Sequence, residues 1–153
     1  MSSTTRRQAR IIALQTLYEV DTSRHLPEDV LQRNLDEPAS ENLSGLPSAD
    51  DKVRDYGSAL VLGVLANRGN LDRLIEECAP SWPLDQMSSI DKNILRLAIF
   101  EILFDNSVPL KAAINEAVEL GKRFGSDSSS RFINGVLGTV AANEQARGRK
   151  LRQ

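Results

Sequence analysis

Three arginines stand close together near the start of the chain, at positions 6, 7 and 10. Arg6 and Arg10 are four residues apart, so a helix would place both on one face, with Arg7 beside them. A planar guanidinium donates paired hydrogen bonds to phosphate and stacks on bases, which suits RNA. This cluster is the best candidate for binding chemistry, although a solvated helix start would have the same composition.

The residues that could act in catalysis or bind a metal do not form a set. The chain has one histidine, His25, and one cysteine, Cys78. One of each cannot complete a structural zinc site, and neither has the partners of a catalytic triad. We interpret His25 as a solvated surface residue and Cys78 as a small buried one. The sequence therefore predicts no metal site, no cofactor and no catalytic residues.

Two further groups of residues have simpler explanations than chemistry. Glu116 and Glu119 could be paired carboxylates, but three residues apart on a helix they form a solvated face that can pair with Lys122. Gly57 and Gly63 are not followed by Lys-Ser/Thr, so no phosphate-binding loop is predicted. Gly135 and Gly138 fall inside a helical pattern. We expect these two glycines to permit close packing between helices.

Length and composition are those of one ordinary soluble domain. The 153 residues are 41% hydrophobic and 26% charged, with a net charge of −2. Both ends are basic, whereas acidic residues gather between positions 28 and 55. No apolar run approaches the roughly 18 residues of a membrane span, and the amphipathic start does not resemble a signal peptide. We expect a cytoplasmic protein that does not enter a membrane.

Apolar residues at helical spacing predict three helices in the first half of the chain, over about 4–20, 27–37 and 48–69. Thr4 or Thr5 would cap the first, and Ser48 the third. We expect Gly69 to end the third helix and Asn70 to cap the next. The Pro- and Ser-rich stretch 38–48 is predicted to be a loop.

The second half of the chain continues the helical pattern. We expect a short helix from Asn70, a rigid hinge in which Pro80 and Pro83 bracket Trp82, and then a strongly apolar helix from an Asp91 cap to residue 104. Further helices are predicted over 109–124 and from 128–130 onward. No stretch favours a strand.

The fold class is therefore all-α, with about seven helices in two small packed bundles. One bundle would cover about 4–79 and the other about 84–145. A basic tail follows over 146–153.

Several stretches in register resemble the NusB family of transcription antitermination factors. They are RRQAR at 6–10 with ALQTLY at 13–18, DKNILRLAIFE at 91–101, Val108-Pro109 with INEAVEL at 114–120, and FINGVLG at 132–138. The resemblance covers most of the chain, apart from residues 22–50 and the tail. It implies an all-helical fold of two small bundles.

The resemblance also implies a function. Proteins of this kind bind boxA-type RNA together with a small-subunit ribosomal protein, NusE. The complex helps RNA polymerase read through terminators, notably in ribosomal RNA operons. The acidic stretch 28–55 could meet the basic ribosomal protein, but a solvated acidic face explains it equally well.

The RNA-binding residues that the resemblance implies lie in two places. Arg6, Arg7 and Arg10 fall in the first helix, and the same matched block holds Gln15 and Tyr18, of which Tyr18 could instead be core. The turn before the last helix is the other expected edge. There Phe124 or Phe132 could stack on a base and Arg131 could meet phosphate, with core packing as the alternative for both phenylalanines.

Two other classes of protein fit parts of the sequence. A similar helical domain precedes RNA cytosine methyltransferases, but this chain has no segment for a cofactor-binding sheet. The chain could also be a helical protein-interaction module without intrinsic RNA selectivity, in which the arginines have no binding role. Monomer and homodimer both fit the sequence.

Overall fold

The computed structural model describes residues 1–36, 50–105 and 107–148. Every regular element in these ranges is a helix, as the sequence predicted. The chain divides into two compact units, Met1–Leu65 and Ala66–Gln153. This division groups residues 66–79 with the second unit, whereas the helical pattern of the sequence predicted them in the first. None of the described helices combines the length and apolarity that crossing a membrane requires.

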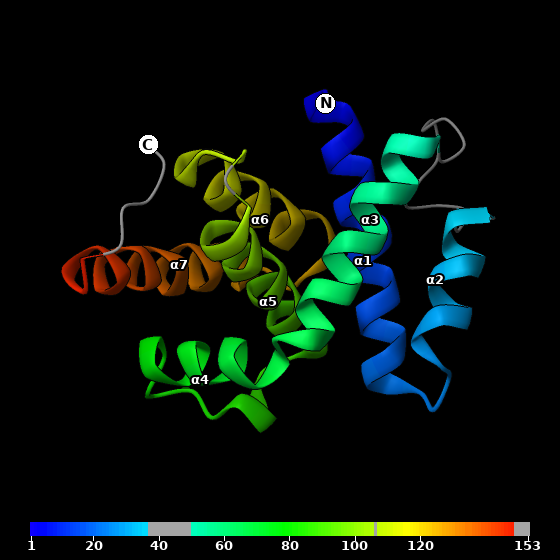
Figure 1. The fold of residues 1–153 in the computed structure, drawn as a ribbon. Helices are drawn as coiled ribbons and strands as arrows, with labels where there is room; N and C mark the ends of the chain where they lie inside the picture. Colours follow the sequence, from blue (N-terminus) through cyan, green and yellow to red (C-terminus); the bar gives the residue numbers. More distant parts are fainter. Residues whose placement is uncertain (37–49, 106, 149–153) are drawn as a thin grey trace. The chain divides into compact units, whose positions relative to one another are not determined.

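The first unit is built on α1 (Ser3–Thr22), with α2 (Pro27–Asp36) and α3 (Asp51–Ala66) (Figure 1). The middle of α1 is buried almost all round, from Gln8 to Leu17. A buried hydrogen bond of 3.0 Å, from Asn34 Nδ2 to Thr16 Oγ1, joins α2 to α1. On α3, Gly57 lies against the backbone of Ala9. The first helix therefore serves as the core element of this unit.

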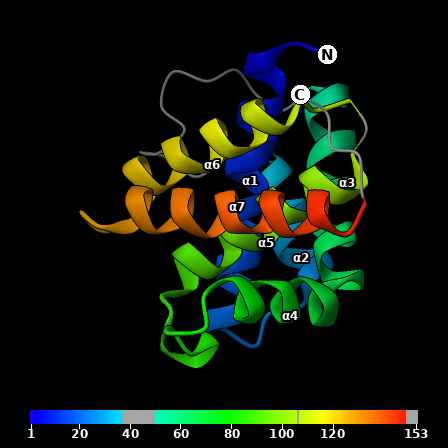
Figure 2. The same cartoon turned by 90° about the vertical axis from the view of Figure 1, so that its left-hand side faces the viewer.

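The second unit holds α4 (Arg68–Cys78), a short 3-10 helix η1 (Leu84–Gln86), α5 (Ser89–Phe104), α6 (Leu110–Phe124) and α7 (Ser129–Ala146). The strongly apolar α5 packs against α4, α6 and α7, and all its residues from Asn93 to Ile99 are buried. Figure 2 shows α6 and α7 lying side by side. The prediction that this helix is central is confirmed.

Helix ends followed the sequence less closely than helix bodies did. Ser2, not Thr4 or Thr5, caps α1, because its hydroxyl oxygen accepts the Thr5 backbone N–H at 3.1 Å. Ser88, not Asp91, caps α5 in the same way. In both cases a serine with extended backbone directly precedes the helix, and its hydroxyl oxygen accepts the backbone N–H of the third helical residue.

The third predicted cap, Ser48, lies outside the described residues. The backbone N–H of Val53 instead bonds to the carboxylate of Asp50 at 2.9 Å. Glu37 and the loop predicted at 38–48 are likewise outside the described ranges.

The break between α3 and α4 also differs from the prediction. It falls at Asn67, and both Gly69 and Asn70 lie inside α4. Gly69 has an ordinary backbone conformation, so it does not end a helix in the left-handed region. Among the described glycines that conformation occurs at Gly148, directly after α7, where φ is +88°. The expected limits of α6 at Pro109 and Gly125 and the start of α7 are confirmed.

Candidate nucleic-acid interface

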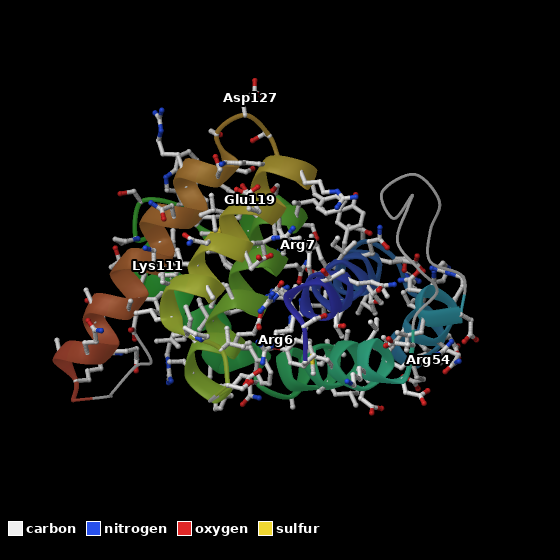
Figure 3. The ribbon with its side chains drawn as sticks, turned by 90° about the horizontal axis from the view of Figure 1, so that it is seen from above. Arg6, Arg7, Arg54, Lys111, Glu119 and Asp127 are labelled. Carbon is white, nitrogen blue, oxygen red and sulfur yellow. The ribbon has the colours of Figure 1, made fainter. Side chains whose placement is uncertain are left out.

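The first two turns of α1 carry the arginine cluster, and Figure 3 labels Arg6 and Arg7 there. This first turn contains no acidic residue, whereas α2 begins with Glu28 and Asp29. Because the N-terminal end of a helix is electropositive, cations there cost a little stability, while acids stabilise it. The arrangement concentrates positive potential at the start of α1, where an anion would be stabilised.

The three arginines differ in how accessible they are. Arg7 is exposed, Arg6 is half-buried, and Arg10 is only 4% exposed. A guanidinium as buried as that of Arg10 has little surface left for a phosphate. The geometry therefore ranks Arg7 first among the three for direct contact with a ligand.

Gln15 and Tyr18 lie further along α1. Gln15 is half-buried, and its Oε1 atom is buried without a hydrogen-bond donor among the described residues. Tyr18 is 42% exposed, so the alternative that it is a core residue is wrong. Eleven residues separate Tyr18 from Arg7, which on a helix is about 16 Å along the axis and within about 20° of the same direction. Both ends of this face are accessible, while Ile11 and Leu14 between them are buried.

The predicted residues of the second unit gather at the start of α7. Arg131 is exposed and Phe132 is half-buried. The Phe132 ring meets Trp82 edge-on, with centroids 5.9 Å apart and planes at 71°. Phe124, also half-buried, lies instead beneath its neighbour Arg123, whose guanidinium carbon is 5.3 Å from the ring centroid. Each phenylalanine therefore keeps part of its ring outside the core.

The exposure of Trp82 was not foreseen from the sequence. Its side chain is 57% exposed and borders a hollow of about 260 Å³ that also has Arg131 and Phe132 in its wall. Pro80 and Pro83 on either side of Trp82 predicted a hinge outside the regular helices, because proline interrupts a helix. They did not indicate whether the indole is buried or exposed.

The serine run before α7 shapes the turn. Ser129 is 1% exposed, and its hydroxyl oxygen accepts the backbone N–H of Ser126 at 2.9 Å. A Cβ added at Gly125 would come within 2.4 Å of that hydroxyl and 2.8 Å of the Gly121 carbonyl oxygen. The tight turn that presents Arg131 therefore needs both the glycine and the serine.

His25 follows α1 in the first unit, whereas Cys78 is the last residue of α4 in the second unit. His25 is exposed as expected, and its Nδ1 lies 2.9 Å from a carboxylate oxygen of Glu19, which also pairs with Arg33. The hydrogen bond with His25 and, to a lesser extent, the contact with Arg33 hold the pKa of Glu19 below its ordinary value. Cys78 is half-buried, and burial raises the pKa of its thiol.

Of the two glutamates that could have been paired carboxylates, Glu119 is exposed and Glu116 is half-buried. Lys122 Nζ lies 3.2 Å from Glu119, which confirms a solvated ion pair on α6. In the described ranges no three His, Cys, Asp or Glu side chains are placed to hold a metal ion. The described parts of the chain thus define an all-helical protein in which each unit carries its own candidate binding surface of arginine and aromatic side chains.

Comparison with known proteins agrees with this class. The chain belongs to the NusB family, whose sequence profile matches residues 7–142. The transcription antitermination protein NusB of Chloroflexus aggregans is 51% identical over 138 residues, covering 88% of this chain and 85% of that one.

Two solved structures show the same fold. T. maritima NusB is 31% identical, with a TM-score of 0.79 and 90% of each chain covered. A structure of the antitermination factors NusB and NusE in complex with dsRNA aligns with a TM-score of 0.79 over 93% of this chain and 99% of that one. At 22% identity this second likeness shows the fold alone.

Proposed function

We propose that this chain is a transcription antitermination protein. It binds single-stranded boxA-type RNA together with the ribosomal protein NusE, as part of an RNA polymerase antitermination complex. The family match over residues 7–142 carries the proposal. It is supported by relatives that are antitermination proteins and by the same fold in a NusB bound to NusE and dsRNA.

The protein acts by tethering and not by catalysis. Contacts with phosphate give salt-sensitive affinity, contacts with unpaired bases give selectivity, and the protein partner enlarges the surface. Arg7, with Arg6 beside it, is placed to supply phosphate contacts, and the exposed ring of Tyr18 is available for stacking. Arg10 supports this surface from a buried position. The protein works in the cytoplasm, where nascent RNA is made.

The second unit supplies the other RNA edge, at Arg131 and the half-buried rings of Phe124 and Phe132. An exposed arginine beside an aromatic ring is the combination that binds a phosphate and its neighbouring base.

Arg7→Ala tests the arginine assignment, with Arg73→Ala as a matched control. Both arginines are exposed, but Arg73 lies on α4 and bonds to Asn70 within its own helix. Affinity for labelled boxA-like RNA is measured by fluorescence anisotropy, and affinity for NusE by calorimetry. Arg7→Ala is expected to weaken RNA binding about tenfold and to leave NusE binding unchanged. The slope of log affinity against log salt concentration should become less steep by about one, because one phosphate contact is lost.

The control variant is expected to bind RNA and NusE like the unchanged protein. Unchanged RNA affinity in Arg7→Ala would sink the assignment. If RNA affinity stays the same even with Arg6 and Arg10 replaced as well, while NusE still binds, the chain is a protein-interaction module.

A further inference from the structure

A network of polar residues runs from α4 to the first turn of α5. On α4, both carboxylate oxygens of Asp72 accept hydrogen bonds from Arg96, at 2.7 and 3.0 Å. Arg96 also donates from Nη1 to Oδ1 of Asn93 at 3.1 Å. The amide nitrogen of Asn93 donates in turn to the carbonyl oxygen of Ser89, the first residue of α5, at 2.8 Å. These four residues form the α4–α5 polar network.

Asn93 is the central member of this network. Its side chain is fully buried, and the next residues of α5, Ile94 and Leu95, are buried and apolar. Asparagine is a poor helix former, and a buried amide is costly unless its oxygen and nitrogen are bonded. Replacing buried polar partners by apolar side chains of the same shape is often neutral or stabilising. The benefit of Asn93 is therefore the orientation that its hydrogen bonds impose, and not stability alone.

The first turn of α5 faces the start of α7. Ser88 and Asp91 line the hollow of about 260 Å³ that also has Arg131 and Phe132 in its wall. Ser89 directly follows the cap residue Ser88. A hydrogen bond that fixes Ser89 therefore fixes how this turn faces Arg131.

We propose that Asn93 is a positioning residue for the RNA edge of the second unit. Held by Arg96, and through it by Asp72, it fixes the first turn of α5 opposite Arg131. Side chains of a binding site must be held to within about 0.5 Å, which requires a supporting layer of fixed residues. The inference rests on the proposed RNA-binding function and deepens it, because it gives a role in RNA binding to a buried residue that makes no contact with RNA.

Asn93→Asp separates the two hydrogen bonds of the amide. The carboxylate still accepts from Arg96, but it cannot donate to the carbonyl oxygen of Ser89. Affinity for labelled boxA-like RNA, measured with NusE at a temperature where the variant is folded, should fall about tenfold, the factor that one hydrogen bond supplies. Asn34→Asp is the matched control. Asn34 is a buried amide of the first unit that donates to Thr16 at 3.0 Å, so this variant also loses a buried donor but should keep RNA affinity.

A double-mutant cycle separates positioning from a general loss of stability. Arg131→Ala should cost less RNA affinity in the Asn93→Asp background than alone, because the displaced turn has already weakened that edge. Arg7→Ala, in the first unit, should cost the same in both backgrounds. Urea unfolding checks that each variant is folded. If Asn93→Asp fails to fold, Arg96→Lys takes its place in the cycle, since it keeps the charge opposite Asp72 and removes the donor to Asn93.

Unchanged RNA affinity in the folded Asn93→Asp variant would overturn the proposal. An equal loss of affinity in Asn34→Asp, or additive effects of Asn93→Asp and Arg131→Ala, would also overturn it, because both results indicate a general effect on stability. In each of these cases selective RNA binding by the unchanged protein leaves the proposed function standing. Absence of selective binding by the unchanged protein, even with NusE, would defeat both.

Discussion

At the scale of single residues, buried charge in the second unit is held by an ion pair between α5 and α4. Arg96, whose side chain is 3% exposed, donates from Nε and Nη2 to the two carboxylate oxygens of Asp72, at 2.7 and 3.0 Å. Its Nη1 donates to Asn93 at 3.1 Å. A planar guanidinium bound by both oxygens fixes the two helices in register.

Asp72→Asn should therefore destabilise the protein strongly. It leaves the Arg96 guanidinium buried without its carboxylate, and removing one partner of a buried pair costs about 3 kcal/mol. Urea unfolding measures the change. Asp85→Asn, at an exposed acid on η1, should stay within about 0.5 kcal/mol of the unchanged protein. Equal stability of the two variants would mean that the ion pair contributes nothing.

The contacts of Glu19 with His25 and Arg33 should make stability depend on pH. The hydrogen bond with His25 and the contact with Arg33 hold the pKa of Glu19 below its ordinary value of 4.5. The charged carboxylate therefore stabilises the fold above that pH, and this contribution disappears as the pH falls through the lowered pKa. Glu19→Gln should cost about 0.5 kcal/mol at pH 7, because the group is near the surface. At pH 3 the variant and the unchanged protein should converge.

Urea unfolding at the two pH values tests this, with Glu76→Gln on α4 as the control for removing an exposed carboxylate. A cost for Glu19→Gln that persists undiminished at pH 3 would rule out the ionic explanation.

At the scale of helices, the glycines of the last two helices have opposite roles. Gly125 sits in the turn that brings α6 to α7, where a Cβ would strike Ser129 and a backbone oxygen. Gly135 and Gly138 are exposed inside α7, and a Cβ at either would meet nothing within 4 Å. The sequence-based interpretation that these two permit close helix packing is wrong.

Gly125→Ala should therefore destabilise by about 1–3 kcal/mol, since its Cβ forces the turn apart. Gly135→Ala should stabilise by about 0.5–1 kcal/mol, because alanine favours a helix and the space is open. Thermal unfolding of both variants gives the comparison. Loss of stability in Gly135→Ala would show that this glycine has a role the open space does not reveal.

The helices could be predicted from the sequence because each buries an apolar face repeated at helical spacing. Their ends could not, because neighbouring residues with oxygen-bearing side chains compete for one cap. Ser2, Thr4 and Thr5 all have a suitable side chain, and the observed backbone decides among them. The same holds for Ser88 and Asp91 at α5.

The candidate site was predicted in part. The arginines of α1 came from their spacing on one helix, and the residues at the start of α7 came from the family resemblance. The exposure of Trp82 depends on segments that meet only in the folded second unit. The spacing of residues along the chain does not indicate which distant segments come into contact. A tryptophan between prolines is as compatible with a buried position as with an exposed one.

At the scale of the whole molecule, the uneven charge explains how an acidic protein could bind RNA. The net charge is −2, but positive side chains concentrate at the first turns of α1, while acids begin α2 and α3. Local potential, and not the total, governs contact with phosphate. A partner that adds its own basic surface would then raise affinity without any change in this chain.

We propose that this chain binds RNA selectively and more tightly with NusE. Fluorescence anisotropy of a labelled boxA-like RNA, titrated with the protein at two salt concentrations, tests it most directly. The titration is run with and without NusE and against a scrambled RNA. We expect selective binding that tightens with NusE and weakens with salt. Equal or absent binding to both RNAs, even with NusE present, would contradict the account.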